Sequence, residues 1–289
     1  MTILFSIGLL LVLVHICSVI GFLIMKHELQ HFLLTRFNCK VGYACDDLGI
    51  SADWLAHRFA LFETFCLPSV AAQDYESFFW FIMIDIRTPV FWKLRLRELC
   101  KMKNLRFVII ESIKFSNTLV LDSIKSMVRE QNAIIVSTRL DNDDALAKTF
   151  ISTVMKICAQ LTPERTRVIN FPVGLQASSL GARLYKPAKV NPFASVMSPF
   201  KNLMSAFQCP HSNLDSIGQL VQVYSDCGKD DTAMWLQVIH SRNIKNRFTR
   251  LHAKRSPVDV QTFNLCPNRQ QTLSLLAVKK TFSKLNNAL

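Results

Sequence analysis

The stretch that decides the fold is Ala133-Ile134-Ile135-Val136-Ser137-Thr138-Arg139-Leu140-Asp141-Asn142-Asp143-Asp144. Its opening apolar run is short, mostly β-branched and bounded by turn-forming residues, which predicts a buried strand. The Asp-x-Asp sequence that follows places two carboxylates, Asp141 and Asp143, at the carboxyl edge of this strand. Open α/β sheets bind their ligands at that edge. The segment therefore predicts a ligand site at the end of a central strand.

The residue types in this cluster favour a hard divalent cation. Mg²⁺ binds through one or two carboxylates together with substrate phosphates, so Asp141 and Asp143 point to a metal-held nucleotide diphosphate. The alternative is structural: the cluster precedes an amphipathic segment, residues 145–160, and acidic residues commonly cap the start of a helix. Asp144 fits either interpretation, as a water-mediated participant or as a cap.

Further apolar runs alternate with helical patterns along the chain. Strands are expected at 31–36, 78–84, 105–110 and 167–171, and helices at 54–66, after an Asp53 cap and before Leu67-Pro68-Ser69, and at 117–130. Such alternation predicts βα units and a mainly parallel sheet. Asp85, which ends the second strand, then lies on the same edge as the acidic cluster. Neither GxGxxG nor GxxxxGK[ST] occurs, so no dinucleotide site or P-loop is indicated.

The amino-terminal segment has the composition of a membrane span. Ile3 to Met25 contains no charged residue, and at ~1.5 Å per residue it reaches roughly 34 Å, enough to cross a bilayer core of about 30 Å. A signal peptide is the alternative, but a basic start and a clear small-x-small cleavage site are lacking. Lys26, Arg36 and Lys40 follow the segment. The positive-inside rule therefore predicts a single-pass membrane protein, anchored by residues 1–26, with its globular domain in the cytoplasm.

The cysteines and the charged residues indicate the compartment and the kind of partner. The nine cysteines form no CxxC pair, which argues against a zinc site and fits a reducing compartment. The net charge is +13, and residues 241–289 carry ten Lys or Arg and one acid. This basic segment predicts an anionic membrane surface as a partner. No nucleic-acid-binding motif accompanies it, so a nucleic-acid binder is disfavoured.

Five separated segments resemble, in the same order, the rhamnosyltransferase family of GT-A type glycosyltransferases. They are His31-Phe32-Leu33-Leu34-Thr35-Arg36-Phe37-Asn38, Trp54-Leu55-x-x-Arg58-Phe59-x-Leu61-Phe62-x-x-Phe65-Cys66-Leu67-Pro68-Ser69, Thr138-Arg139-Leu140-Asp141-Asn142-Asp143-Asp144-Ala145, Asn170-Phe171-Pro172-x-Gly174 and Trp235-Leu236-Gln237-Val238-Ile239-His240-Ser241-Arg242-Asn243-Ile244-Lys245-Asn246-Arg247. The likeness runs from about residue 31 to residue 250. The likeness implies a GT-A type domain over 27–250, while the apolar and basic compositions outside it predict an anchor over 1–26 and a basic extension over 251–289.

The resemblance implies transfer of a sugar from a nucleotide diphosphate donor, such as dTDP-rhamnose, to a hydroxyl of a glycan or a lipid-linked acceptor. A divalent cation, Mn²⁺ or Mg²⁺, would neutralise the leaving diphosphate. Asp141 and Asp143 are its expected ligands, and His240 matches the late histidine that GT-A enzymes often add; a structural histidine is the alternative there. Asp85 resembles the acid that contacts the base or ribose, although a turn role fits it too.

Other residues are expected to bind substrate or to move protons. Arg36 and Arg139, at strand ends, present guanidinium forks suited to the diphosphate, or serve as structural ion pairs. An inverting transfer needs a general base. Asp230 and Asp231 are the first candidates by position, Asp215 and Asp226 the next, and His211 is a candidate for acceptor binding. A different class stays open: a catalytically silent membrane scaffold that uses the basic carboxyl-terminal segment.

Overall fold

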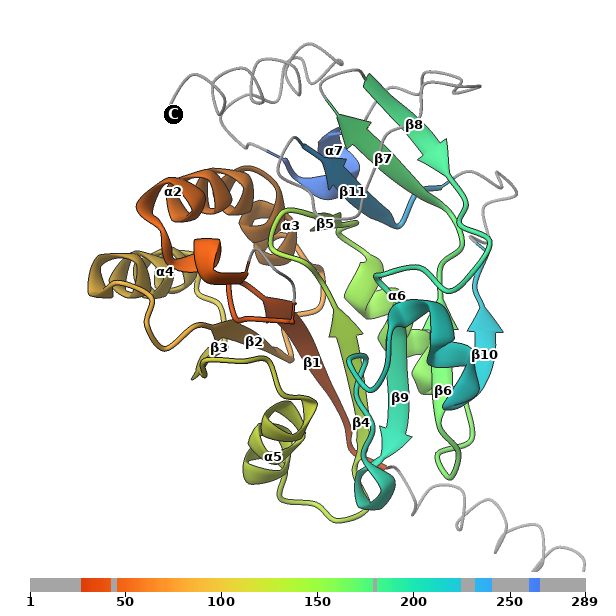
Figure 1. Ribbon diagram of the computed structural model, residues 1–289. Coiled ribbons are helices and arrows are strands. Elements are labelled where there is room, and N and C mark those ends of the chain that lie inside the picture. The colour runs from red at the N-terminus through yellow and green to blue at the C-terminus, as the bar shows by residue number, and fades with distance from the viewer. Residues whose placement is uncertain (1–26, 43–45, 179–180, 225–231, 241–259, 266–289) are drawn as a thin grey trace, which may run out of the picture.

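The computed structural model describes residues 27–42, 46–178, 181–224, 232–240 and 260–265. Within these ranges two sheets lie side by side, and helices cover the larger one (Figure 1). The predicted anchor over residues 1–26 lies outside the described residues. In the ranges that are described, no helix combines the length and the apolar character needed to cross a bilayer.

The larger sheet has seven strands in the order β10-β6-β9-β4-β1-β2-β3. The strands are β1 (Leu29–Arg36), β2 (Phe78–Ile84), β3 (Phe107–Glu111), β4 (Ile134–Arg139), β6 (Arg167–Asn170), β9 (Ser195–Pro199) and β10 (Gln219–Gln222). Neighbours β4-β1-β2-β3 are all parallel, as are β6 and β10, whereas β9 runs antiparallel between β4 and β6. The predicted α/β class with a mainly parallel central sheet is confirmed.

The predicted strands are found because each is an apolar run ended by a polar residue. β2 is buried almost throughout, as expected for a central parallel strand covered on both faces. It pairs with β1 so that Arg36 lies beside Met83, and β1 pairs with β4 so that Leu34 lies beside Arg139. The carboxyl ends of β1, β2 and β4 therefore meet at one edge of the sheet.

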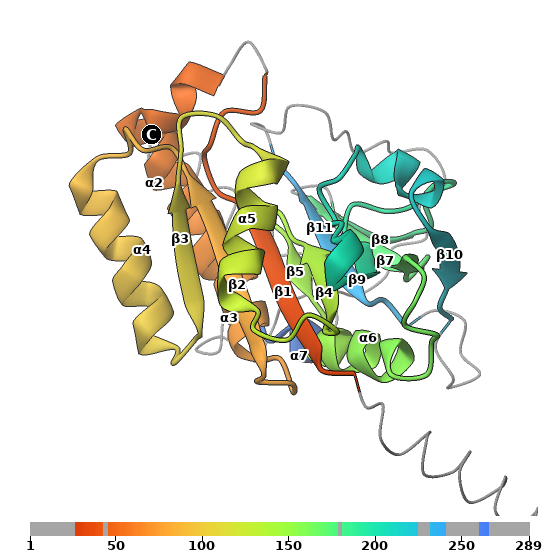
Figure 2. The ribbon, with the colours of Figure 1, turned by 90° about the horizontal axis from the view of Figure 1, so that it is seen from below.

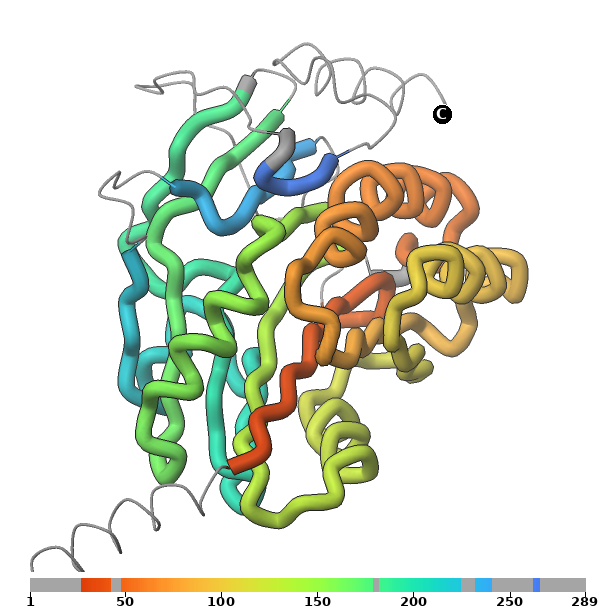
Figure 3. The backbone as a smooth tube through the Cα atoms, turned by 180° about the vertical axis from the view of Figure 1, so that it is seen from behind, coloured from red at the N-terminus to blue at the C-terminus, as the bar shows by residue number. Residues whose placement is uncertain are grey.

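The helices before α7 pack around this sheet (Figures 2 and 3), whereas α7 lies beside the smaller sheet (Figure 1). They are α2 (Ala52–Leu61), α3 (Leu67–Ala71), α4 (Val90–Met102), α5 (Asn117–Met127), α6 (Phe150–Cys158) and α7 (Val260–Phe263), with 3-10 turns η1 (Asp46–Ile50), η3 (Phe200–Asn202) and η4 (His211–Ser216). In α4 and α5 the residues that face the sheet, among them Leu96 and Ile124, are buried. This is the amphipathic pattern of a helix on a sheet.

The first helix differs from the sequence prediction at both ends. Its cap is Ser51, whose Oγ accepts a hydrogen bond from the Trp54 N–H, rather than Asp53. Pro68 does not end the helical path either, because a π-helical turn, η2 (Phe62–Cys66), leads directly into α3. Proline lacks the N–H of an interior helical residue and its ring crowds the preceding turn. The wider π turn accommodates it at the start of α3.

A second sheet was not predicted. It has the order β5-β11-β7-β8, with β5 (Ala145–Leu146), β7 (Gly174–Ser178), β8 (Gly181–Tyr185) and β11 (Trp235–Ile239). β5 pairs with β11 across almost a hundred residues of sequence, and β11 runs parallel to β7. Phe263 and Leu265, from the range predicted as a basic extension, are buried in the same core as Trp235. This sheet joins distant parts of the chain beside the acidic cluster.

His31 supplies a pH-dependent contribution to the stability of this sheet. It lies in β1, is 1% exposed, and its Nε2 is 2.8 Å from Thr138 Oγ1 in β4. Burial lowers the pKa of His31 to about 3. Below pH 6.5 the unfolded chain binds a proton at this residue and the folded chain does not, so stability falls as the pH drops from 6.5 towards 3. We expect a loss of about 2 kcal/mol between pH 6.5 and pH 5.

Urea unfolding of the protein and of His31→Leu at several pH values checks this expectation. The variant lacks the titrating group, so its free energy of unfolding should fall less steeply between pH 6.5 and 5. Parallel curves for the two proteins would show that His31 is protonated in the folded state over this range.

Candidate functional site

The acidic cluster lies where β4 leaves the large sheet and enters the small one. Leu140 still bonds to β1 through its N–H, which donates to Leu34 O, and β5 begins at Ala145. The helix expected over 145–160 starts only at Phe150, after Thr149. The helix-cap interpretation is therefore wrong, because residues 140–144 connect β4 of the large sheet to β5 of the small one and do not precede a helix directly. The cluster sits in the crossing and not on a helix.

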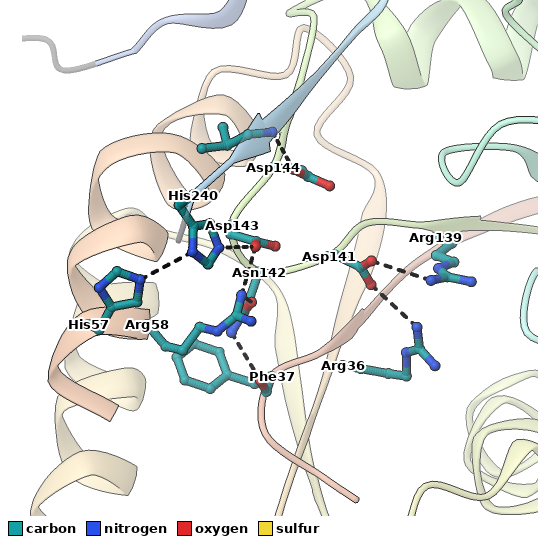
Figure 4. A network of polar contacts seen from close by, with 11 residues as sticks. Arg36, Phe37, His57, Arg58, Arg139, Asp141, Asn142, Asp143, Asp144 and His240 are labelled. Atoms are coloured by element: carbon teal, nitrogen blue, oxygen red, sulfur yellow. Dashed lines mark hydrogen bonds and ion pairs between the residues drawn. The ribbon is translucent and has the colours of Figure 1, made fainter. Parts of the chain in front are cut away.

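Asp143 is the centre of a buried polar network. Its Oδ2 accepts from Arg58 Nη1 at 2.7 Å and from His240 Nε2 at 2.8 Å, and its side chain is 8% exposed (Figure 4). Burial would raise the pKa of Asp143, but the charge of Arg58 and the hydrogen bond from His240 outweigh it and hold that pKa well below its usual range. Asp143 is thus a carboxylate at neutral pH.

The network extends from Asp143 to a second histidine. His240 follows β11, and its Nδ1 is 3.3 Å from Nε2 of His57 in α2. One of the two rings donates this bond and the other accepts it, according to their tautomers. Both rings are buried. Three elements distant in sequence, α2, the β4–β5 crossing and β11, are therefore joined through one carboxylate.

Arg58 is fixed on three sides. Its Nη1 also donates to Asn142 Oδ1 at 3.2 Å, and the Asn142 amide donates to Phe37 O. Its guanidinium lies 4.9 Å from the centre of the Trp54 ring. Among the described residues its buried Nε has no hydrogen-bond partner. Arg58 therefore holds the crossing against α2 and keeps one donor atom unused.

Asp141 has a different environment from Asp143. Its side chain is 32% exposed and turns towards Arg36 at 3.6 Å and Arg139 at 3.3 Å, away from His240 (Figure 4). Burial raises the pKa of Asp141, but the charges of Arg139 and Arg36 more than compensate and the pKa lies below its usual range. One carboxylate thus faces two guanidinium groups at the end of β1 and β4.

Two aromatic rings, those of Phe207 and Phe115, pack against the two arginines. The guanidinium carbons of Arg36 and Arg139 lie 4.8 and 5.2 Å from the centre of the Phe207 ring. Phe115 contacts Phe207 edge to face and lies 5.5 Å from Arg36. Arginine stacked on an aromatic ring keeps its in-plane N–H donors available for an anion. In the described part of the chain, the buried Nε of Arg139 has no hydrogen-bond partner.

Asp144 is buried and serves the second sheet. Its Oδ1 accepts from the Val238 N–H of β11 at 2.7 Å. Burial, together with the negative charges of Asp143 and Asp141, raises the pKa of Asp144 well above its usual range. The three acids of the cluster are therefore distinct: the pKa values of Asp141 and Asp143 are lowered, whereas that of Asp144 is raised, and the Asp144 carboxyl links the crossing to β11.

Asp85 ends β2 at the predicted edge, but its carboxylate faces Arg87. Oδ1 accepts from the Arg87 N–H and Nε, and Oδ2 from Nη2 at 2.7 Å, while the Asp85 side chain is fully buried. Burial acts to raise the pKa of Asp85, and the bonds and charge of Arg87 hold it below its usual range. Both oxygens of Asp85 therefore bind the exposed arginine, and its contact with a base or ribose stays a prediction.

The candidates for proton transfer have different positions. Asp230, Asp231 and Asp226 lie outside the described residues, and Asp215 is exposed in η4. His211 begins η4, and its Nδ1 is 2.8 Å from Val190 O, so Nδ1 carries the hydrogen. Burial lowers the pKa of His211, and the charges of Arg139, Asp141 and Arg36 also act on it. A contact of His211 with an acceptor stays a prediction.

The predicted metal ligands are not assembled in this arrangement. Asp143 and His240 are in contact, but Asp141 turns to the arginines, and the described residues contain no group of three His, Cys, Asp or Glu placed to hold a metal ion. The donor types nevertheless fit a divalent cation, because Asp141 and Asp143 are ionised oxygen ligands on one short crossing. A cation would have to draw Asp141 away from Arg36 and Arg139.

Sequence reasoning missed His57, Arg58 and Phe207. A signal for Arg58 was present, since it is a charged residue within the apolar stripe of the first helix. Two charged or polar neighbours on the buried face of a helix indicate a buried partner. No such signal exists for Phe207, because its role depends on two arginines from strands far away in sequence.

The fold is of the α/β class, and the charged residues of this site lie at the carboxyl edge of its mainly parallel sheet, which is the edge where open α/β sheets bind ligands. The chain belongs to the family described as "Putative rhamnosyl transferase", whose model matches residues 48–250. It is therefore a member of a glycosyltransferase family, as its five sequence segments predicted.

Two solved structures are similar at low identity. The mannosyltransferase PcManGT from Pyrobaculum calidifontis, in complex with GDP-Man and Mn²⁺, has a TM-score of 0.44 and 9% identity, over 75% of this chain and 59% of that one. The present chain thus spans less than two thirds of that chain. A 4-diphosphocytidyl-2C-methyl-D-erythritol synthase from Anaerococcus prevotii has a TM-score of 0.36 and 8% identity, over 72% and 90%. No curated protein sequence matches the chain.

Proposed function

We propose that this protein transfers a sugar, rhamnose in the first instance, from a nucleotide diphosphate donor to an acceptor hydroxyl with the assistance of a divalent cation. The observation that carries this proposal is the pair of arginines, Arg36 and Arg139, which both contact the carboxylate of Asp141 at the sheet edge and stack on Phe207. Two stacked guanidinium groups present N–H forks that suit the oxygens of a diphosphate. The family of the chain supports a sugar donor.

The residues of the site would have different roles in binding the donor. Arg36 and Arg139 would bind the diphosphate oxygens, because their Nη groups already hold an anion and the Phe207 ring fixes their planes. Arg58 and His240 hold Asp143 in one orientation. Asp144 keeps the crossing attached to β11. Arg36, Arg139 and Asp143 would therefore be positioned before the donor arrives, which lowers the reorganisation needed in the transition state, whereas Asp141 would have to turn from the arginines to the cation.

Asp141 and Asp143, with His240, would hold the cation, Mn²⁺ or Mg²⁺. When bound, such a cation neutralises the charge that develops on the leaving diphosphate. On the acceptor side, His211 would contact the acceptor, and Asp230 or Asp231 would take the proton. We place the acceptor on a glycan or a lipid-linked carrier at an anionic membrane, since the apolar segment over residues 3–25 and the basic residues after 241 both favour that location.

Calorimetric titration of the full chain in detergent with a panel of nucleoside diphosphates, with and without Mn²⁺, tests the proposal. We expect one nucleotide to bind with dependence on Mn²⁺, and Asp141→Asn to weaken that binding by at least about tenfold, because a lost charged ligand is worth more than 1.4 kcal/mol. Asp122→Asn is the matched control, since Asp122 is an exposed acid on α5.

The outcomes separate the parts of the proposal. If Asp141→Asn binds the nucleotide more tightly without metal, the arginine site stands and the metal role of Asp141 is wrong. If a folded protein binds no nucleotide under any condition, the transferase proposal fails and the silent scaffold takes its place. Release of free sugar from the bound nucleotide sugar then identifies the donor.

A further inference from the structure

A cavity lies beside the last strand of the large sheet, and none of the acidic cluster lines it. Its volume is about 330 Å³, which is within the range of ligand pockets, about 300 Å³ and upwards. Its walls come from the connection between β8 and β9, from the turn η4 and from β10, which lies beside η4 (Figure 1). The polar residues that line it are Lys189, Ser212, Asn213, Asp215, Ser216 and Gln222. The cavity has room for one small ligand.

The cavity belongs to the same edge of the sheet as the two arginines, Arg36 and Arg139. β10 is parallel to β6, and β6 is parallel to β4 because both run antiparallel to β9. Gln222 ends β10, so it lies at the carboxyl edge. Phe207, the ring on which both arginines stack, precedes Ser212 by five residues. The Cα atoms of Phe207 and Ser212 are therefore at most ~18 Å apart.

Buried residues hold the walls of the cavity in place. Leu214 of η4 and Val168 of β6 belong to one small apolar core, which fixes the turn against the sheet. In the connection before β9, the Asn191 N–H donates to Asn170 Oδ1 at 3.0 Å. Asn170 Nδ2 in turn donates to Gln222 Oε1 at 2.7 Å. The cavity is therefore formed before a ligand arrives, as binding sites for small molecules usually are.

The lining of the cavity presents donors and acceptors without a net charge. Lys189 and Asp215 contribute one charge of each sign, and in the part of the chain that the structure describes neither is in an ion pair. The other polar groups are hydroxyls and amides. The Asn213 side-chain oxygen accepts from Ser212 Oγ at 3.0 Å, which leaves the Asn213 amide nitrogen as a donor. Such a lining favours a neutral ligand with several hydroxyl groups over an anion, because each hydroxyl both donates and accepts.

Tyr224 adds an aromatic ring beside this lining. It is 62% exposed and follows Gln222 by two residues. Val223, between them, packs against the main core and donates its N–H to Asn170 O, so the chain stays extended past the end of β10. Side chains alternate in an extended chain, which places Tyr224 on the side of Leu220 and Gln222, both of which line the cavity. An apolar ring face next to hydroxyls and amides suits a sugar ring, which has an apolar C–H face and a polar edge.

We propose that this cavity binds one neutral sugar ring of the acceptor, with Tyr224 against its apolar face and Asn213 and Gln222 bonded to its hydroxyls. That the sugar is the acceptor rests on the proposed function, because the cavity shares its sheet edge with the arginines that would bind the donor. Binding of the sugar itself requires neither nucleotide nor cation. The proposal commits the acceptor to a carbohydrate and excludes the hydroxyl of a lipid or of a protein side chain.

Saturation-transfer NMR of the full chain tests this, with a panel of methyl glycosides of hexoses and deoxyhexoses as the probes. A phosphocholine detergent keeps the chain in solution without presenting a sugar of its own. We expect at least one glycoside to bind in the absence of nucleotide and metal. Ala188→Trp should weaken that binding at least about tenfold, because residue 188 is an exposed lining position and the indole occupies part of the cavity. Tyr224→Ser should also weaken it about tenfold, or ~1.4 kcal/mol, because the sugar loses its apolar contact.

Phe91→Ser is the matched control for Tyr224→Ser. Phe91 is an aromatic residue of similar exposure, 64%, but it lies in α4, which leads to β3 at the opposite end of the sheet order. This variant should bind the glycoside as the unchanged protein does. Thermal melting confirms that all three variants, changed at exposed positions, are folded.

The proposal is overturned if no glycoside binds, if Ala188→Trp binds as tightly as the unchanged protein, or if a nucleoside diphosphate displaces the glycoside, which would place the sugar in the donor site. Failure of the proposed function is a separate result. Glycoside binding that Ala188→Trp removes, in a protein that binds no nucleotide, would keep the sugar-binding cavity and exclude the donor site at the arginines.

Discussion

Asp143→Ala is expected to lower the free energy of unfolding by about 3–5 kcal/mol, because it leaves the buried Arg58 without its counterion. The side chains of Arg58 and Asp143 are 11% and 8% exposed, and their charged atoms are 2.7 Å apart. The same carboxylate also holds His240, so the variant loses two hydrogen bonds at once. Urea unfolding measures the loss.

Asp141→Ala is the matched control for this prediction. Asp141 belongs to the same crossing, but its side chain is 32% exposed and its ion pairs are longer, 3.3 and 3.6 Å. Exposed pairs of this kind contribute about 0–1 kcal/mol. A small loss for Asp141→Ala beside a large loss for Asp143→Ala shows that the fold depends on the buried carboxylate of Asp143 and not on that of Asp141. Equal losses in the two variants would mean that water screens Arg58 as well.

A double variant distinguishes the ion pair from simple packing. Arg58→Leu/Asp143→Leu removes both charges, so it should recover part of the stability that the single Asp143→Leu loses. If the double variant is as unstable as the sum of the single changes, the two residues do not stabilise each other.

Gly174→Ala is expected to lower the free energy of unfolding by about 3 kcal/mol or more, since it puts a methyl group into an indole ring. A Cβ at residue 174 would lie 2.1 Å from Trp235 Cδ2 and 2.2 Å from Cε2. Trp235 cannot move aside easily: it is fully buried, stacks on Phe193 at 4.8 Å, and its Nε1 donates to Phe171 O. Thermal and urea unfolding measure the effect.

Gly174→Ala should also disturb the residues of the candidate site. β11 begins at Trp235, and its Val238 N–H binds Asp144, while His240 directly follows the strand. Nucleotide binding should therefore weaken together with stability. Gly174→Ala/Trp235→Phe provides room by shortening the ring, and it should be more stable than the sum of the two single variants. A loss below about 1 kcal/mol for Gly174→Ala would show that the second sheet yields to the methyl group.

Local sequence was sufficient to predict the elements whose residues are buried along their whole length. β2 was predicted to the residue, because an unbroken apolar run that ends at Asp85 has a single compatible structure, a central strand. Helix α4 was missed, as were the strands β9 and β10 and those of the second sheet. Those strands are short and mixed in polarity, and their pairing partners lie far along the chain. The periodicity of apolar residues along a short segment does not indicate which distant strand that segment pairs with.

The sequence by itself determined that Asp141, Asp143, Arg36 and Arg139 would stand at one sheet edge, because apolar strands that alternate with helices bring the ends of parallel strands together. Only the tertiary structure decided what each of them contacts. Asp143 pairs with Arg58 and His240, and Asp141 pairs with the two arginines that stack on Phe207. Asp85 pairs with Arg87. The physical reason is that a buried charge takes whichever opposite charge or donor the packing brings within about 3 Å, and packing is a property of the whole chain.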